Sequence, residues 1–151
     1  MRTRDIVASA AYAFAAALAV GCYSLQPPVD PQHILDLRSQ SEGGTALDAP
    51  IGLIGPSCYT PRYPEELRLA RVGGTVVLLL TIDTQGRVVP PIRLDSTTDH
   101  RLDAYAASVV RTCRFRPGVL HGQAQRGLAW LPVTSRVLDS GDVDIAFGPP
   151  H

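Results

Sequence analysis

At 151 residues, the chain has room for one domain with a leader and a tether, and not for two domains. Hydrophobic residues make up 45% of it and charged residues 19%, an ordinary globular balance that excludes collagen, coiled coil and polyampholyte disorder. The formal net charge is zero, so the composition gives no basic surface with which to neutralise the phosphates of a nucleic acid.

The N-terminus has the pattern of an export signal, because Arg2 and Arg4 precede an apolar, charge-free stretch over 6–25. Three fates are open. The run 18–22 resembles a bacterial lipobox, in which Cys22 receives the lipid anchor. The stretch is also long enough to cross a bilayer uncleaved, and cleavage after an Ala-x-Ala site would release a soluble protein. Each fate places the folded part in the cell envelope, facing the periplasm.

The cysteine count fits an oxidising compartment. If Cys22 is acylated, Cys58 and Cys113 remain as a pair that such a compartment allows to form a disulfide. Two buried free thiols are the alternative. A zinc site with His100 or His121 lacks the short ligand spacings that such sites show, and we expect no metal site.

Composition divides the chain into four predicted segments. Residues 1–21 form the signal peptide or membrane anchor, and 22–57, with several prolines and a Ser/Gly-rich run, form a flexible tether. The folded domain covers 58–138. The last segment, 139–151, is polar and rich in glycine and proline, and we expect it to be disordered.

The first half of the predicted domain contains a helix and two strands. A short helix over 63–73 has a proline near its start and a glycine past its end. The segment 74–83 alternates with period two and predicts a strand. Val77 and Leu79 make its second face half apolar, which indicates self-association, a partner, or cover by the tether or tail. A turn leads to the return strand 87–94.

The second half contains a helix and one more strand. The Pro90-Pro91 pair removes two backbone donors and predicts a bulge or an edge in the return strand. Thr97, Thr98 and Asp99 offer helix N-caps for a helix that runs to about residue 112. A connection over 114–125 precedes the last strand, 128–138. This order predicts an α+β fold of helix, strand, strand, helix, strand: a three-stranded antiparallel sheet with both helices on one face.

The order and spacing of these elements resemble the C-terminal domain family of TonB, the periplasmic end of the energy transducer for outer-membrane transporters. The resemblance covers 63–137, half of the chain. The residues that carry it are Tyr63-Pro64, Gly73-Gly74-Thr75-Val76, Asp83, Gly86-Arg87-Val88, Leu102-Asp103, Ala106, Arg114-Phe115-Arg116-Pro117 and Pro132-Val133.

The resemblance implies a peptide-binding function. In the family, the last strand receives a short segment from the N-terminus of a transporter, and backbone pairing at a free sheet edge provides most of the affinity. Arg62 and Tyr63 would lie near the groove. The implied binding edge consists of Leu131, Val133, Thr134, Ser135, Arg136 and Val137. The alternative is that Pro132 and Arg136 only protect this edge from aggregation.

Three features depart from the family. The apolar stretch 6–25 has no histidine of the kind that the family's anchor uses, the tether is short, and a lipid anchor gives no access to the proton gradient. We therefore expect a membrane-anchored domain that binds a transporter N-terminal peptide or another envelope protein. The alternative is a structural or assembly lipoprotein that uses the same fold for self-association, as in a homodimer.

We expect no enzyme and no cofactor. The four histidines lie in predicted loops or tails, and none has a neighbouring nucleophile or orienting carboxylate at a useful spacing.

Overall fold

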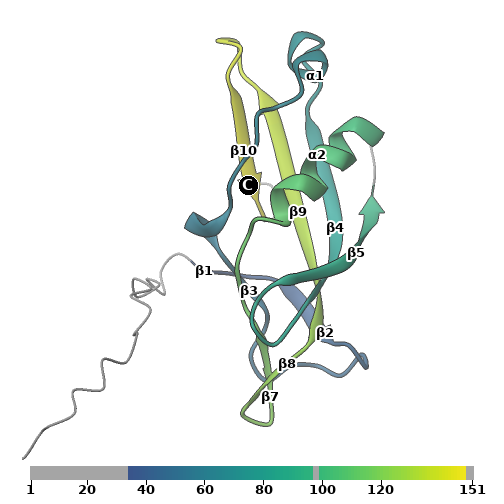
Figure 1. Ribbon diagram of the computed structural model, residues 1–151, viewed down its shortest axis with the longest axis vertical. Coiled ribbons are helices and arrows are strands. Elements are labelled where there is room, and N and C mark those ends of the chain that lie inside the picture. Colours follow the sequence, from purple (N-terminus) through teal and green to yellow (C-terminus); the bar gives the residue numbers. More distant parts are fainter. Residues whose placement is uncertain (1–33, 97–98, 149–151) are drawn as a thin grey trace, which may run out of the picture.

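The computed structural model describes residues 34–96 and 99–148. The predicted signal or anchor (1–21), the predicted lipidation site Cys22 and the possible caps Thr97 and Thr98 lie outside the described residues. The elements follow one another (Figure 1) as β1 (Ile34–Asp36), β2 (Arg38–Ser41), β3 (Gly52–Ile54), the 3-10 helix η2 (Gly55–Ser57), α1 (Glu65–Leu69), β4 (Gly74–Ile82), β5 (Val88–Ser96), α2 (His100–Val110), β6 (Phe115–Arg116), β7 (Gly118–Leu120), β8 (Gln123–Gln125), β9 (Gly127–Val137) and β10 (Val143–Phe147).

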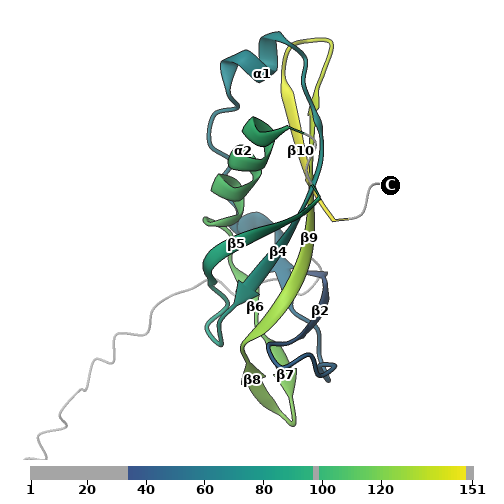
Figure 2. The same ribbon diagram turned by 90° about the vertical axis from the view of Figure 1, so that its right-hand side faces the viewer.

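The predicted order of helix, strand, strand, helix and strand is confirmed in α1, β4, β5, α2 and β9. Strand β4 lies at the centre, antiparallel to β9 on one side and to β5 on the other. Its alternate residues are apolar and fully buried, because this face of the sheet is covered by helix. Both α1 and α2 lie on the same side of the sheet (Figure 2).

Strand β5 departs from regular pairing at two places. Leu79 pairs with Arg93 and Thr81 with Val89, so the Pro90-Pro91 pair, which is a cis peptide, lies in the predicted bulge. The second irregularity is at Asp95, an extra residue between the partners of Leu78 and Val77. Bulges of this kind redirect a side chain, and Asp95 lines a pocket.

Helix α2 begins at the predicted cap. The Asp99 carboxylate accepts a hydrogen bond from the backbone N–H of Arg101, at 2.9 Å. The hydrogen bonds that the Arg101 side chain and backbone donate hold the pKa of Asp99 well below its usual value. The helix buries an apolar stripe that includes Leu102, Ala106 and Val109 against the sheet.

The predicted flexible tether is wrong over 34–57. Residues 34–36, 52–54 and 115–116 form a second, three-stranded sheet in the order β1-β3-β6, and β2 pairs with the start of β9. Leu37, Ile51 and Leu53 are buried in the same core as the helices. The strands within 34–57, which are β1, β2 and β3, have only three or four residues each, too few for a period to stand out from the surrounding proline, glycine and serine.

The predicted disordered tail is wrong over Val143–Phe147, which forms β10 and pairs antiparallel with β9. The connecting turn has Gly141 at φ 87°, and its N–H donates to the carbonyl of Leu138 at 2.9 Å. A three-residue loop that ends in a left-handed glycine is a common hairpin connection. With β2 and β10 added, the predicted three-stranded sheet has five strands.

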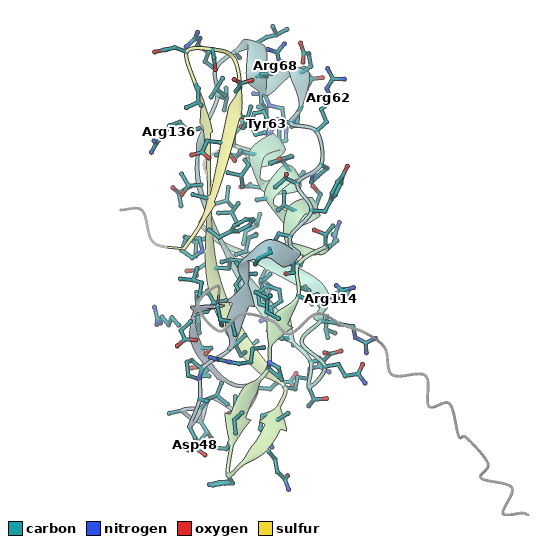
Figure 3. All side chains as sticks on the ribbon, turned by 90° about the vertical axis from the view of Figure 1, so that its left-hand side faces the viewer. Asp48, Arg62, Tyr63, Arg68, Arg114 and Arg136 are labelled. Atoms are coloured by element: carbon teal, nitrogen blue, oxygen red, sulfur yellow. A yellow bond between two sulfur atoms is a disulfide. The ribbon has the colours of Figure 1, made fainter. Side chains whose placement is uncertain are left out.

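A second hairpin, β7 with β8, extends from the far end of the molecule (Figure 1). His121 and Gly122 have positive φ values of 52° and 74°, the conformation of a tight hairpin turn. Asp48 (labelled in Figure 3) accepts a hydrogen bond from the backbone N–H of His121 at 2.6 Å. His121 is therefore a turn residue, as its sequence neighbour Gly122 indicates.

None of the helices within the described part of the chain is long and apolar enough to cross a membrane.

Candidate protein-binding edge

The outer side of β9 is shared by two short strands. Strand β2 pairs with 127–130, and β10 pairs with 133–137. Between them, Pro132 accepts a hydrogen bond from the backbone N–H of Gly148 at 2.9 Å. The expectation that β9 is the free edge of the sheet is therefore wrong, since a strand cannot be added there while β10 is in place.

The free edge on this side of the sheet belongs to β10. Two hydrogen bonds fix its orientation: Leu138 N–H donates to the carbonyl of Asp142 at 2.8 Å, and Gly148 N–H donates to that of Pro132. Backbone groups alternate in direction along an antiparallel strand, so the even-numbered residues of β10 face β9. The N–H and C=O groups of Val143, Ile145 and Phe147 point away from it. Within the described residues, β10 is the last strand of its sheet and these groups have no partner.

The side chains of β10 separate into two faces. Val143, Ile145 and Phe147 are half-buried and pack against the hydrophobic core, whereas Asp144 and Ala146 are exposed on the opposite face. The strand is thus fixed by its apolar side chains while one backbone edge stays open. That combination gives an incoming segment a rigid template for pairing.

The predicted edge residues on β9 have other roles. Leu131, Val133 and Ser135 are buried on the helix-covered face. Thr134 shares a hydrogen bond of 2.8 Å with the hydroxyl of Thr75 on β4. Val137 is half-buried against the core, and Arg136 is exposed on the hairpin side (Figure 3).

Tyr63 is a core residue and not part of an open groove. Its hydroxyl donates to the carbonyl of Val72 at 2.7 Å, and its ring meets Tyr105 edge to face with 4.8 Å between centroids. Burial raises the pKa of both tyrosines. Arg62 is exposed, and Figure 3 shows it on the opposite side of the molecule from Arg136. The structure thus brings Tyr63 close to Ser135 of the predicted edge, whose side chain acts on the Tyr63 hydroxyl, but it does not bring Arg62 and Arg136 together.

The tip of the β9–β10 hairpin is held against α1. Arg71, just after the helix, forms a 3.0 Å ion pair with Asp139 in the hairpin turn. Both side chains are largely exposed, so the pair contributes little stability by itself. It links the residue after α1 to the turn from which β10 begins.

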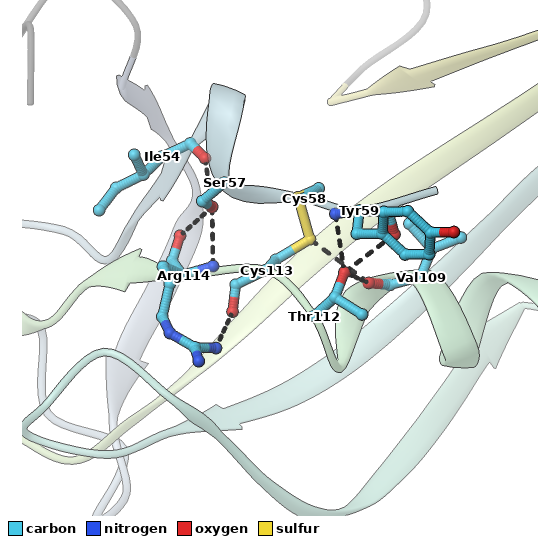
Figure 4. Close-up of a disulfide and its surroundings, with 8 residues drawn as sticks. All are labelled: Ile54, Ser57, Cys58, Tyr59, Val109, Thr112, Cys113 and Arg114. Carbon is cyan, nitrogen blue, oxygen red and sulfur yellow. Dashed lines mark hydrogen bonds between the residues drawn. A yellow bond between two sulfur atoms is a disulfide. The ribbon is translucent and has the colours of Figure 1, made fainter. Parts of the chain in front are cut away.

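Cys58 and Cys113 form a disulfide, as predicted (Figure 4). It joins the segment before α1 to the end of α2, with the two Cα atoms 4.1 Å apart. Hydrogen bonds surround it: the Ser57 hydroxyl accepts from the backbone N–H of Arg114 at 2.8 Å, and the Thr112 hydroxyl donates to the carbonyl of Tyr59 at 2.9 Å. The disulfide and these hydrogen bonds form one clasp, which joins residues 57–59 before α1 to residues 112–114 after α2.

No group of three or more His, Cys, Asp or Glu side chains in the described ranges is placed to hold a metal ion. The site is therefore described by its backbone edge and its neighbouring side chains.

The family model of the Gram-negative bacterial TonB protein C-terminal matches residues 59–134, half of the chain. This chain belongs to the TonB C-terminal family. No curated protein and no solved structure matches it. The TonB C-terminal domain is a periplasmic, protein-binding domain without catalysis, so a general envelope-protein partner follows from membership.

The boundaries of the match explain why β9 is expected from the sequence to be the free edge of the sheet. The matched residues contain α1, β4, β5, α2 and most of β9, whereas β2 and β10 lie outside them. In this TonB C-terminal domain, the strands that cover the outer side of β9 come from the flanking sequence. The matched residues alone therefore predict that the outer edge of β9 is unpaired. The flanking strands β2 and β10 pair with that edge.

Proposed function

We propose that this periplasm-facing domain binds an extended segment of another envelope protein as an added strand on the outer edge of β10. The observation that supports the proposal is the row of outward backbone groups on Val143, Ile145 and Phe147, which have no partner among the described residues. The partner is the N-terminal segment of an outer-membrane transporter or another envelope protein. A lipid on Cys22 or an N-terminal helix would hold the domain at a membrane while it binds.

Binding at this edge is expected to be modest in affinity. Each backbone hydrogen bond contributes about 0.5–1.5 kcal/mol net, because it replaces bonds to water. The outward row is short, and the exposed side chains beside it, Asp144 and Ala146, add little apolar area. Such an edge suits a transient partner whose selectivity comes from side chains elsewhere.

The decisive variant is Ile145→Pro. Proline at this position removes an outward N–H and leaves the N–H groups that face β9. Its matched control is Ile145→Ala, which removes the same side chain but keeps the donor. Isothermal titration of the full-length chain with synthetic N-terminal segments of outer-membrane transporters should show binding by the alanine variant, and binding about two- to tenfold weaker by the proline variant. Equal affinity of the two variants would exclude strand addition at β10.

A second arrangement has the incoming strand replace β10 on β9, which would restore the family role of 131–137. A cross-strand disulfide distinguishes it. Val137 and Val143 face each other at a pair without direct hydrogen bonds, where Cα atoms are close enough for a disulfide. If β10 stays in place, the oxidised Val137→Cys/Val143→Cys variant binds as the wild type does. If β10 must leave, the oxidised variant does not bind.

A structural or assembly role is the alternative. The specific observation is that Val77 and Leu79 are half-exposed and alternate with the buried residues of β4, which places them on the face opposite the helices. A second copy could cover them, in keeping with a homodimer. Sedimentation velocity of the wild type and of Leu79→Ser over a range of concentrations tests this role: a dimer that the substitution disrupts supports assembly, and a monomer throughout excludes it.

A further inference from the structure

A pocket of about 350 Å³ lies on the sheet face opposite the helices, at the gap between β2 and β10. The residues that line it include Asp36, Arg38, Val77, Asp95, Trp130 and Pro132. Gly148, where β10 ends, closes one side. The pocket therefore exists because neither short strand covers the middle of β9.

The floor of the pocket is apolar and comes from two paired strands. Val77 of β4 pairs with Pro132 of β9, and Trp130 is two residues further along β9 on the same face. All three side chains are half-exposed. A volume of this size lies at the lower end of small-ligand pockets, which run from about 300 to 1,000 Å³, and it suits one large side chain.

The charged groups at the rim differ in what they already contact. Asp36 forms a 2.6 Å ion pair with Arg116, and the Arg38 guanidinium stacks over the Trp130 ring at 4.7 Å from its centroid. Asp95 is exposed and has no ion pair within the described part of the chain. The bulge in β5 turns it towards the pocket. Among the described residues, the rim thus has one carboxylate, Asp95, and one guanidinium, Arg38, without an ion-pair partner.

We propose that this pocket takes a large apolar side chain of a partner segment that carries Lys or Arg within two residues of it. The apolar side chain fills the floor, and the basic side chain pairs with Asp95. The inference goes beyond strand addition, because it concerns the opposite face of the sheet and side-chain chemistry instead of the backbone of β10. It supplies the sequence selectivity that a short backbone edge lacks.

Trp130 is the single tryptophan of the chain and reports on the pocket directly. The full-length chain is titrated with three peptides that lack tryptophan and tyrosine: acetyl-Ala-Phe-Arg-Ala-amide, the same peptide with Glu in place of Arg, and the same peptide with Ala in place of Phe. Tryptophan emission should change saturably with the first. Loss of the Phe ring should weaken binding about tenfold or more, and reversal of the charge about two- to fivefold.

Two aspartate variants test the rim. The Asp95→Asn variant should bind the Arg peptide and the Glu peptide equally well. The control is Asp144→Asn, which removes an exposed charge on β10 outside the pocket and should still bind the Arg peptide more tightly. Val77→Thr, which preserves shape but adds a hydroxyl to the floor, should weaken the Phe-Arg peptide several-fold.

The proposal is overturned if the Phe-Arg peptide leaves the emission unchanged, or if all three peptides act alike. It is also overturned if the two aspartate variants bind the peptides alike. A dependence of the emission on protein concentration would overturn it too, because it would show that a second copy of the chain occupies the pocket. The Ile145→Pro variant should leave this titration unchanged. Failure of strand addition and failure of the pocket are thus seen in different measurements.

Discussion

The backbone N–H of Gly148 donates to the carbonyl of Pro132 at 2.9 Å. This bond is the last of the β9–β10 pairing, and it is made at a residue that has no backbone donor of its own. Beyond it the outer side of β9 has no added strand until β2 begins at Arg38. One hydrogen bond therefore marks both the end of the covered edge and the start of the pocket.

The turn between β4 and β5 should not tolerate Gly86→Ala. Gly86 has φ 75°, and an added Cβ would overlap the carbonyl oxygen of Phe115. The left-handed conformation costs about 1–2 kcal/mol and the overlap about 1–3 kcal/mol more. Urea unfolding should show a loss of at least about 2 kcal/mol. Gly43→Ala, at an open position without a positive φ, is the control and should be nearly neutral.

The disulfide should contribute strongly to stability. Its cysteines are 55 positions apart, and a closed loop of that length corresponds to about 4 kcal/mol in the chain-entropy description. Cys58→Ser should lower the free energy of unfolding by that order under oxidising conditions. With reductant present, the wild type should unfold at the same urea concentration as the variant. Equal stability of the two proteins in oxidant would contradict the structural role of the clasp.

Much of the fold follows from patterns in the sequence. The strand 74–82 alternates over nine residues, and helix α2 has a cap and a continuous apolar stripe, so each is decided by local chemistry. The pairing of Cys58 with Cys113 was open between a disulfide and free thiols until the structure placed α2 beside the segment before α1. Long, periodic elements are predictable, because their pattern repeats often enough to exceed chance.

The candidate site was predicted less well, for a physical reason. Which strand forms the edge depends on what pairs with β9, and that is decided by residues far from it in the sequence. The signal for β10 was present, since Val143, Ile145 and Phe147 alternate after the turn glycine Gly141. A single five-residue strand next to glycine and proline gave too weak a pattern to be recognised as a strand.

The N-cap of α2 should make stability depend on pH. The Asp99 carboxylate has its pKa lowered, first by the hydrogen bond from the Arg101 side chain. A group whose folded-state pKa lies below its unfolded value of about 3.9 stabilises the fold above that value. The contribution is then lost as the pH falls towards the lower, folded pKa. The difference in unfolding free energy between the wild type and Asp99→Asn should therefore be constant near neutral pH and shrink below about pH 4.

The hydroxyl of Tyr63 should matter for folding and not for binding. It donates to the carbonyl of Val72, and the ring packs on Tyr105, so Tyr63→Phe keeps the packing and leaves a partly buried carbonyl without its donor. Such a loss costs about 1–2 kcal/mol. Urea unfolding should show this decrease, whereas the exposed Arg62→Ala should leave stability within about 0.5 kcal/mol of the wild type. If Tyr63 instead belonged to the peptide groove, Tyr63→Phe would weaken transporter-peptide binding in calorimetry. We expect unchanged affinity, because β10, where the peptide is proposed to pair, holds its position through its own side chains.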